Sequence, residues 1–399
     1  MEEPTRARAR RHIFDAFAAA AVAAALWMFA GPEPGLRAAG DPQTATASPA
    51  PPQTRVVPGA EWEPLADPSS AGFCQAGLDR ATEQAATMAT TGAVAVVGGR
   101  VLWSHGDLEH VSYVASVRKS ILAMLYGKYV ERGSIRIDAT IGELGIDDHE
   151  GLLPAELDAT VADLLGARSG VYHPASNAAC AGCGSTAGDP PGPRGSVRPG
   201  TYFLYNNWDF NALGTIFEQQ TGLDVYDAFQ ADLAEPLGLQ DFDRAAHRPR
   251  RGNRNSVHGA YHFNLSARDL ARIGLLMLRE GAWGGRQLVP RDWARRIVSV
   301  VTPVGQMNPE RYRQGPFGYG YLWWIWDGPH AAGPYRGAYT GIGAIGQFVT
   351  VLPEIGLVVA HKTRQGGESV TRPQFLELVD RLVTARCAPA PAAPAGARR

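Results

Sequence analysis

Apolar runs rich in β-branched and aromatic residues lie near both ends of the folded part of the chain. The runs GAVAVV and RVLWSHG are separated by Gly98 and Gly99, and such a pair of runs around two glycines favours a β-hairpin. Three further runs predict strands in the C-terminal part: YGYLWWIW from position 319, GQFVTVLP from 346 and IGLVVAHK from 355. The alternation within 321–326 predicts a strand whose tryptophans are mostly core residues, with room for one to line an apolar pocket.

Between these runs, apolar residues recur with the period of an α-helix. One segment holds Ile121, Leu122, Leu125 and Val130 on a single stripe, and Gly133 ends the pattern. Further helices are predicted by VADLLGARSGV, NNWDFNALGTIFEQQTG, NLSARDLARIGLLMLREG and PQFLELVDRLVTARC. Strands at both ends with helices between them predict an α/β (α+β) domain. Its core sheet is completed by the C-terminus, and it contains an inserted helical subdomain.

The first 31 residues are typical of a targeting segment. Four arginines between positions 6 and 11 precede an apolar run that ends at Gly31, which is shorter than a full membrane span. The sequence thus predicts an exported protein, periplasmic or extracellular. An uncleaved membrane anchor over 13–31 is one alternative, and a buried soluble helix is another. Residues 32–70 are expected to be a Pro/Ala-rich linker, 71–387 the folded domain, and 388–399 a disordered tail.

Export makes the four cysteines candidates for disulfides. Four cysteines allow three pairings. Cys74 and Cys387 bracket the folded part, and chain ends often lie close together. Cys180 and Cys183 are close in sequence. We therefore predict the disulfides Cys74–Cys387 and Cys180–Cys183.

Charge and motifs restrict the partners. The net charge of −1 argues against a general nucleic-acid binder, and no Gly-rich phosphate loop follows a predicted strand. A zinc site built from Cys180, Cys183, His258 and His262 is a weaker alternative to the disulfides, since both pairs lie in Gly/Pro-rich loops without a zinc spacing. We expect no metal or organic cofactor, and membrane contact only through the N-terminal segment.

The choice of lysine at position 119 is the first sign of chemistry. Of the 38 basic residues only three are lysines, and Lys119 follows Ser116 by three positions on a predicted helix. Residues at i and i+3 share a helix face, so the two side chains can touch. A serine needs a base to become a nucleophile, and lysine can deprotonate whereas arginine cannot. The alternative is a chance Ser-x-x-Lys with Lys119 at the surface.

A second segment strengthens this interpretation. Tyr205 and Asn207 come just before the helix that starts in NNWDFNALG. A phenol next to an ammonium group can shift toward phenolate and relay protons, and an asparagine amide can bind a substrate carbonyl. The competing interpretation makes Tyr205 a core aromatic residue and Asn207 a helix cap.

These segments resemble the serine β-lactamase-like hydrolases, which include class C β-lactamases, D-alanyl-D-alanine carboxypeptidases, related esterases and 6-aminohexanoate-dimer hydrolases. The resemblance covers roughly 90–380 and consists of four ordered segments: ASVRKSIL, YNNWDFNALG, SARDLARIGLLMLREGAWGGRQLVPRDW and GAIGQFVTVLPEIGLVVAHK. It implies an antiparallel sheet with flanking helices plus a helical domain, with the site between them. It also implies that Ser116 is the nucleophile, Lys119 the base and Tyr205 a proton relay.

The family's third motif, Lys/His-Thr-Gly, is replaced here by Tyr339, Thr340 and Gly341. The stretch HKTR at 361–364 is not this motif, because it follows the closing strand and lacks the glycine. Penicillins and D-Ala peptides carry a carboxylate that favours a cation, and a tyrosine offers only a hydroxyl. This departure favours an esterase or amidase.

Other residues complete the predicted site. Arg336 or Arg364 could still supply a cation, and Tyr172, on the loop after ARSG, could contact substrate or merely pack. The backbone N–H of Ser116 and of a residue in 341–345, where Gly341 and Ile345 are candidates, would bind the oxyanion. His173, His258 and His262 are more readily explained as loop or core histidines.

The sequence therefore predicts a serine hydrolase that cleaves an ester or amide bond of a small-molecule or peptide-like substrate through an acyl-enzyme on Ser116. One alternative is a penicillin-interactive enzyme, a β-lactamase or D-Ala-D-Ala carboxypeptidase. The other is a non-catalytic binding or sensor relative.

Overall fold

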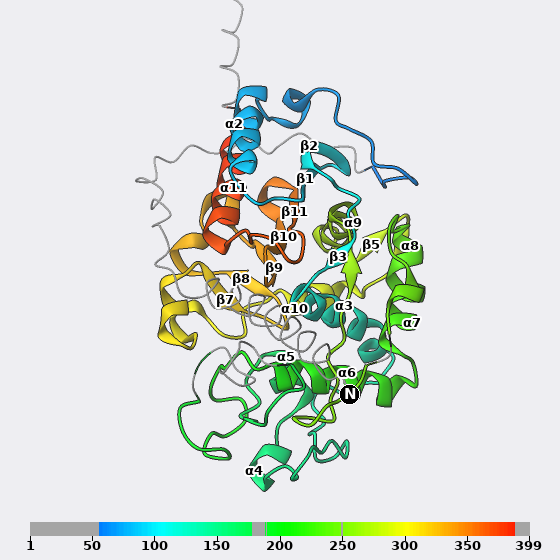
Figure 1. The fold of residues 1–399 in the computed structure, drawn as a ribbon, viewed down its shortest axis with the longest axis vertical. Coiled ribbons are helices and arrows are strands. Elements are labelled where there is room, and N and C mark those ends of the chain that lie inside the picture. The colour runs from blue at the N-terminus through cyan, green and yellow to red at the C-terminus, as the bar shows by residue number, and fades with distance from the viewer. Residues whose placement is uncertain (1–55, 178–187, 189, 249, 388–399) are drawn as a thin grey trace, which may run out of the picture.

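The main antiparallel sheet is built from both ends of the described region. The computed structural model describes residues 56–177, 188, 190–248 and 250–387. Within them a seven-stranded sheet has the order β2-β1-β11-β10-β9-β8-β7 (Figure 1). Its strands are β1 (Gly92–Val97), β2 (Arg100–Gly106), β7 (Phe317–Tyr319), β8 (Trp324–Trp326), β9 (Tyr339–Gly343), β10 (Gln347–Leu352) and β11 (Leu357–Lys362). The N-terminal hairpin pairs with β11, so the C-terminus completes the sheet as predicted.

Helices cover both faces of the central strands, which explains why β1, β10 and β11 are buried along their whole length. On one face α2 (Gln75–Ala86) packs with α11 (Arg372–Thr384), and Phe375 of α11 stacks on Phe348 of β10 with ring centres 4.2 Å apart. On the other face lies α9 (Ala267–Leu278), where Gly274 allows a close approach to Val358 and Val349.

The helix α3 (Val117–Glu131) occupies the centre of the molecule. Every residue from Val117 to Gly127 is buried, because β9, α6 (Asn207–Thr221) and α10 (Arg291–Ile297) surround it. The short strand β3 (Ser112–Tyr113) leads into α3 and pairs with β4 (Asn264–Leu265). The start of α3 is thus fixed from several sides, and the sequence-predicted helix around Lys119 is confirmed.

The region between β2 and β7 supplies the helical part, which fills the lower and right-hand parts of Figure 1. Besides α3, α6, α9 and α10 it contains α4 (Pro154–Leu157), α5 (Val161–Leu165), α7 (Val225–Phe229), α8 (Glu235–Leu237), β5 (Ala282–Trp283) and β6 (Arg286–Gln287). Single helical turns are η1 (Pro68–Ala71), η2 (Gln230–Ala234), η3 (Arg244–Ala246), η4 (Val304–Gln306), η5 (Glu310–Gln314), η6 (Gly328–Ala331), η7 (Gly333–Tyr335) and η8 (Pro353–Ile355).

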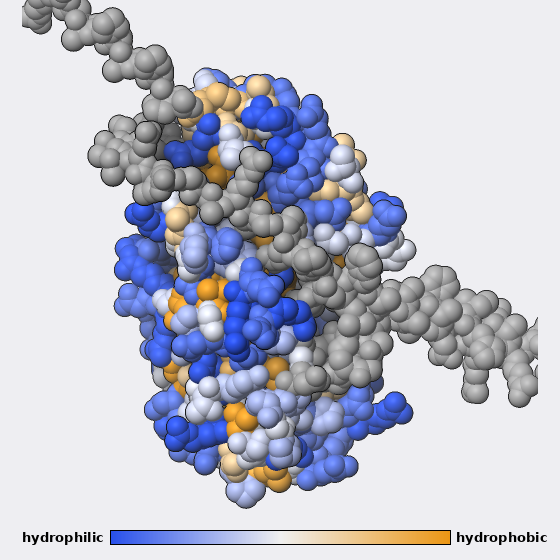
Figure 2. Space-filling view, turned by 90° about the vertical axis from the view of Figure 1, so that its left-hand side faces the viewer, coloured by the Kyte–Doolittle hydropathy of each residue, from blue (hydrophilic) through white to orange (hydrophobic). Residues whose placement is uncertain are grey.

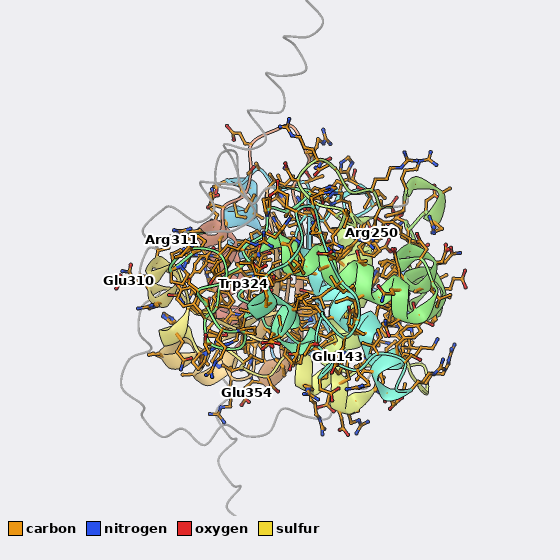
Figure 3. All side chains as sticks on the ribbon, turned by 90° about the horizontal axis from the view of Figure 1, so that it is seen from below. Glu143, Arg250, Glu310, Arg311, Trp324 and Glu354 are labelled. Atoms are coloured by element: carbon orange, nitrogen blue, oxygen red, sulfur yellow. A yellow bond between two sulfur atoms is a disulfide. The ribbon has the colours of Figure 1, made fainter. Side chains whose placement is uncertain are left out.

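The segment YGYLWWIW differs from the prediction of one strand. It forms the end of β7, a bend and then β8, with Leu322 in the left-handed region at φ +62°. Its tryptophans are core residues, as predicted. Trp324 lies near the middle of the molecule seen from below, whereas Glu310 and Glu354 lie at its rim (Figure 3).

The start of α2 meets the C-terminal end of the described region. Cys74 and Cys387 form the predicted disulfide, with Cα atoms 5.3 Å apart. The predicted pair Cys180–Cys183 and the N-terminal segment up to residue 55 lie outside the described residues. Residues 56–70, expected as linker, pack against the domain: the Leu65 amide donates to the Val101 carbonyl at 2.8 Å. Pro64 forms an isolated parallel β-bridge with Val101.

The visible surface is largely hydrophilic, with small separate hydrophobic patches (Figure 2). In the part of the chain that the structure describes, no helix combines the length and apolarity that a membrane crossing requires.

Candidate active site

The candidate nucleophile stands on a sharp turn from strand to helix. Ser116 caps α3 and is partly exposed, and the preceding Ala115 adopts a left-handed φ of +49° that is uncommon for a residue with a Cβ. The Val114 amide donates to the Phe263 carbonyl at 3.0 Å, which extends the β3–β4 pairing up to this turn. The turn therefore presents Ser116 from a rigid support.

Lys119 brings the predicted residues together. Its Nζ lies 2.9 Å from Ser116 Oγ, 2.5 Å from Tyr205 Oη and 2.9 Å from Asn207 Oδ1. The amide oxygen of Asn207 only accepts, so one N–H points there. A neutral amine then has one N–H and one lone pair left. It can donate the N–H to one of the two neighbouring hydroxyl groups and accept a hydrogen bond from the other. The arrangement suits a lysine that accepts the proton of Ser116.

Burial sets the charge state of this cluster. Lys119 is 1% exposed, and loss of hydration together with the positive charge of Arg118 holds its pKa well below the usual lysine value. Burial raises the pKa of Tyr205 above the ordinary phenol value, although its hydrogen bond to Ser116 opposes the shift. The predicted shift of Tyr205 toward phenolate runs against the direction of this pKa change, and the two pKa directions together favour a neutral amine facing a protonated phenol.

Aromatic rings form the walls around the amine. The Lys119 nitrogen lies 4.2 Å from the ring centre of Tyr205 and 4.4 Å from that of Phe210. Tyr205 is in turn stacked on Trp324, with ring centres 5.5 Å apart. These contacts exclude water from the lysine and fix the phenol, so Tyr205 is a packed aromatic residue and a member of the site at once.

Arg118 is a site residue that sequence reasoning missed. Its side chain is 1% exposed, its Nη2 donates to Asn211 Oδ1 at 2.9 Å, and its guanidinium lies over the Tyr261 ring at 4.3 Å. Among the described residues it forms no ion pair with a carboxylate. Asn211 also donates to Asn177 Oδ1 at 2.9 Å, which ties this cation to the loop after α5.

The helix cap is shifted by one residue from the alternative considered for Asn207. Asn206 is the cap of α6, and its Oδ1 accepts from the Trp208 amide at 3.1 Å. Asn207 is the first helical residue, and its Oδ1 is used by Lys119. The predicted contact of Asn207 with substrate therefore remains a prediction for its amide nitrogen alone.

Tyr339 does not behave as a replacement for the cation of the third motif. It is 3% exposed and packs edge-on against Trp323 with ring centres 5.3 Å apart, and burial raises its pKa. A substrate contact through Tyr339 thus has no support. Gly341 instead allows β9 to approach α3, since a Cβ there would lie 3.3 Å from Ser120 Oγ.

Among the described residues, no hydrogen bond joins Tyr172 or the two exposed arginines to the cluster of Ser116, Lys119 and Tyr205. Burial raises the pKa of Tyr172, and its ionisable neighbours are Tyr202 and Asp209. Arg336 and Arg364 are both exposed. Their proposed roles toward substrate stay predictions.

The turn between β9 and β10 approaches the nucleophile. At Gly343 a Cβ would lie 3.1 Å from Ala115 Cβ and 2.5 Å from the Val114 carbonyl oxygen, so only glycine fits. Ile345, in the same turn, has a left-handed φ of +58°. Within the described residues, neither its backbone N–H nor that of Ser116 has an acceptor. Two free donors next to Ser116 suit an oxyanion.

Two of the histidines considered above, His173 and His258, are buried core residues. His173 is 3% exposed, with ring nitrogens 2.9 Å from the Pro174 carbonyl and 2.8 Å from the His149 carbonyl. His258 is 2% exposed and contacts Thr215 Oγ1 at 3.0 Å. In the described segments no three potential metal ligands come together, and the cysteines of the zinc alternative lie outside them.

Comparison with protein families gives one match over most of the chain. The family model described as Beta-lactamase matches residues 78–376. A curated relative, an uncharacterised protein of Alkalihalophilus pseudofirmus, is 28% identical over 102 residues, which are 24% of this chain. The match spans only 29% of that relative's length.

Solved structures share the fold at low sequence identity. A putative 6-aminohexanoate-dimer hydrolase from Bacillus anthracis is 19% identical with a TM-score of 0.54, covering 76% of this chain and 80% of its own. A β-lactamase from Mycobacterium bovis is 21% identical with a TM-score of 0.53 and coverages of 77% and 99%. A penicillin-binding protein homologue from Pyrococcus abyssi is 18% identical with a TM-score of 0.55 and coverages of 79% and 78%.

Proposed function

Because the chain belongs to the Beta-lactamase family, we propose that it is a serine hydrolase that cleaves an ester or amide bond through an acyl-enzyme on Ser116. The observation that carries this proposal is the contact of one buried lysine nitrogen with Ser116 Oγ at 2.9 Å and Tyr205 Oη at 2.5 Å. A buried neutral amine has no evident structural purpose beside a partly exposed hydroxyl, whereas it is the base that acyl transfer needs.

In the first step Ser116 Oγ attacks the acyl carbon while its proton passes to the Lys119 amine. The C=O double bond opens, and the backbone N–H groups of Ser116 and Ile345 stabilise the oxyanion. The tetrahedral intermediate collapses and the C–O or C–N bond to the leaving group breaks. Tyr205 donates its proton to the leaving group and recovers one from the lysinium, so the proton count balances.

Water completes the cycle by the same route in reverse. The base cluster takes a proton from water, hydroxide adds to the acyl-enzyme carbonyl, and the ester bond to Ser116 breaks. The acid leaves, and Ser116 Oγ regains its proton. Every step uses groups of this chain.

We favour an ester or linear amide over a penicillin because the position of the third-motif cation holds a buried tyrosine, Tyr339. We also propose that the protein is exported, which its N-terminal segment and the disulfide between Cys74 and Cys387 support. A small ester or amide is the expected partner.

A fluorophosphonate probe with peptide mass spectrometry tests the nucleophile. We expect a single label on Ser116 that disappears in Ser116→Ala, while Ser104→Ala, a matched change at an exposed serine, keeps it. Hydrolysis of short-chain esters and linear amides should require Lys119 and should be lost in Lys119→Arg. Labelling that persists in Ser116→Ala would contradict the proposal. A stable adduct with labelled penicillin would favour the penicillin-interactive alternative, and normal folding without any turnover would favour the binding relative.

A further inference from the structure

The last residue of β11 reaches the strand that leads to the nucleophile. Lys362 is 1% exposed, and its Nζ donates to the Ser112 carbonyl at 2.8 Å and to the Tyr113 carbonyl at 3.1 Å. These two residues form β3, and Ser116 follows three positions later. Among the described residues Lys362 has no carboxylate partner, so its contacts in this region are with backbone oxygen.

The residues on either side of Lys362 bind the turn between β9 and β10, which carries Ile345. His361 Nδ1 lies 2.9 Å from the Gly346 carbonyl, and Thr363 Oγ1 lies 3.4 Å from the same oxygen. Gln347 Nε2 donates to the Thr363 carbonyl at 2.8 Å and to the Ile345 carbonyl at 3.1 Å. The turn that carries the free Ile345 N–H is thus fixed through its carbonyl groups.

We propose that His361, Lys362 and Thr363 form a buried clamp that positions the two backbone segments of the oxyanion site, 112–116 and 344–346. The inference rests on the proposed function, because it assigns these segments to one reaction. In the sequence the same stretch, HKTR, had no role, since it does not match the family's third motif. The structure gives this stretch a supporting role: His361, Lys362 and Thr363 are positioning residues that touch no reacting atom.

The chemistry of each side chain fits the clamp. Burial lowers the pKa of Lys362 to about 7, and the amine keeps at least two N–H groups for two carbonyls in either charge state. Burial lowers the pKa of His361 to about 4, so the ring is neutral near pH 7. With its Nδ1–H donated to Gly346, its Nε2 accepts from Thr90 Oγ1 at 3.0 Å. The hydrogen-bonding groups of Lys362 and of His361 are therefore satisfied without a counter-ion.

Packing leaves the turn no freedom on the side of Thr363. Gly346 has a φ of +81°, and a Cβ there would lie 2.3 Å from Thr363 Oγ1. Such contact means that a displacement of β11 moves the turn with it. Because oxyanion donors act over a few tenths of an ångström, a loosened clamp should lower the rate of the chemical step more than substrate binding.

The test compares Lys362→Met and Lys362→Arg with the unchanged chain and with Lys128→Met. Lys128 is the matched control, since it lies in the last turn of α3 and bonds to Asp232 of η2 rather than to either segment of the clamp. Active sites are counted by fluorophosphonate titration, so that kcat refers to folded enzyme only. We expect Lys362→Met to lower kcat by about 10-fold or more with KM changed less than about twofold, and Lys362→Arg to recover most of kcat.

A second pair of variants keeps the proposal testable if Lys362→Met does not fold. His361→Asn keeps a donor for Gly346 and should retain kcat, whereas His361→Leu removes it and should not. Equal kcat for all variants, or a loss confined to KM, would overturn the clamp. Failure of the unchanged chain to label at Ser116 would instead reject the proposed function, so the two failures are distinguishable.

Discussion

At the scale of single residues, the candidate chemistry depends on a lysine that is kept neutral. Lys119 is buried and has the cation of Arg118 as its sequence neighbour, and both circumstances disfavour its ammonium form. An arginine at position 119 would stay charged and could not accept a proton. This explains a lysine in a chain whose basic residues are otherwise almost all arginines.

The role of Arg118 can be measured as a pH dependence. The neutral form of Lys119 is the active one, so kcat/KM should fall as pH drops through the pKa of this amine. Arg118→Gln removes a positive charge, which raises the Lys119 pKa and shifts the acid limb of the pH–rate profile to higher pH. At pH 7 we expect kcat/KM to fall about 10-fold.

Arg132→Gln is the matched control, because Arg132 is exposed at the end of the same helix. Its profile should coincide with that of the unchanged chain. An unshifted acid limb in Arg118→Gln, with the fold intact, would show that Arg118 does not tune the base.

Sequence spacing predicted Ser116, Lys119 and Tyr205 because the first two share a helix face and the third belongs to a recognisable segment. Arg118 and Lys362 could not be found in that way. An arginine or lysine is ordinarily read as a surface residue, and only the packing of distant elements shows that these two are buried. The signal for Arg118 was weak but present: the positions three and four residues later on the helix, Ile121 and Leu122, are apolar.

At the scale of elements, the approach of β9 to the start of α3 decides the shape of the site. Gly343→Ala tests it, since the new Cβ would meet the Val114 carbonyl oxygen at 2.5 Å. Either β9 or the nucleophile turn must move, and we expect kcat to fall about 10-fold or more. The free energy of unfolding should fall by about 1–3 kcal/mol in chemical denaturation.

Gly305→Ala serves as the comparison, because a Cβ at Gly305 has open space around it. It should change neither quantity appreciably. Unchanged kcat in Gly343→Ala would mean that the close contact is irrelevant to the site.

Periodicity located most of the elements but not the breaks within them. Apolar runs predicted β1, β2, β10 and β11, and the stripe in 117–131 predicted α3. The bend between β7 and β8 escaped, because Leu322 takes a left-handed conformation that an apolar residue rarely adopts. The only local signal was Gly320, a single glycine within an otherwise strand-like run. Residues 56–70 escaped as well, since their packing along β2 uses backbone hydrogen bonds that composition does not reveal.

At the scale of the whole molecule, one covalent bond joins the first and last described helices. Replacing both Cys74 and Cys387 by serine opens a loop of 313 residues, and loop entropy predicts a loss of about 5–6 kcal/mol in the free energy of unfolding. Denaturant titration with and without a reductant measures it. We expect normal kcat at 25 °C, since neither cysteine contacts the site.

Reduction of the unchanged chain also opens the predicted Cys180–Cys183 bond, so it should lower the stability at least as much as the double variant does. If the double variant kept the full stability, the bond would be incidental to the fold. If it lost kcat at the same time, the terminal layer of α2 and α11 would reach the site through β11.

The pairing of β1 with β11 has a consequence for how the protein is made. The contact of Lys362 with the Ser112 carbonyl joins residues 250 positions apart. During synthesis the hairpin β1–β2 must wait, unpaired on one edge, until nearly the entire polypeptide has left the ribosome. A product of interrupted translation that ends before β11 would carry Ser116 and Lys119 yet lack their support. Premature release would thus yield an inert fragment rather than an unregulated hydrolase.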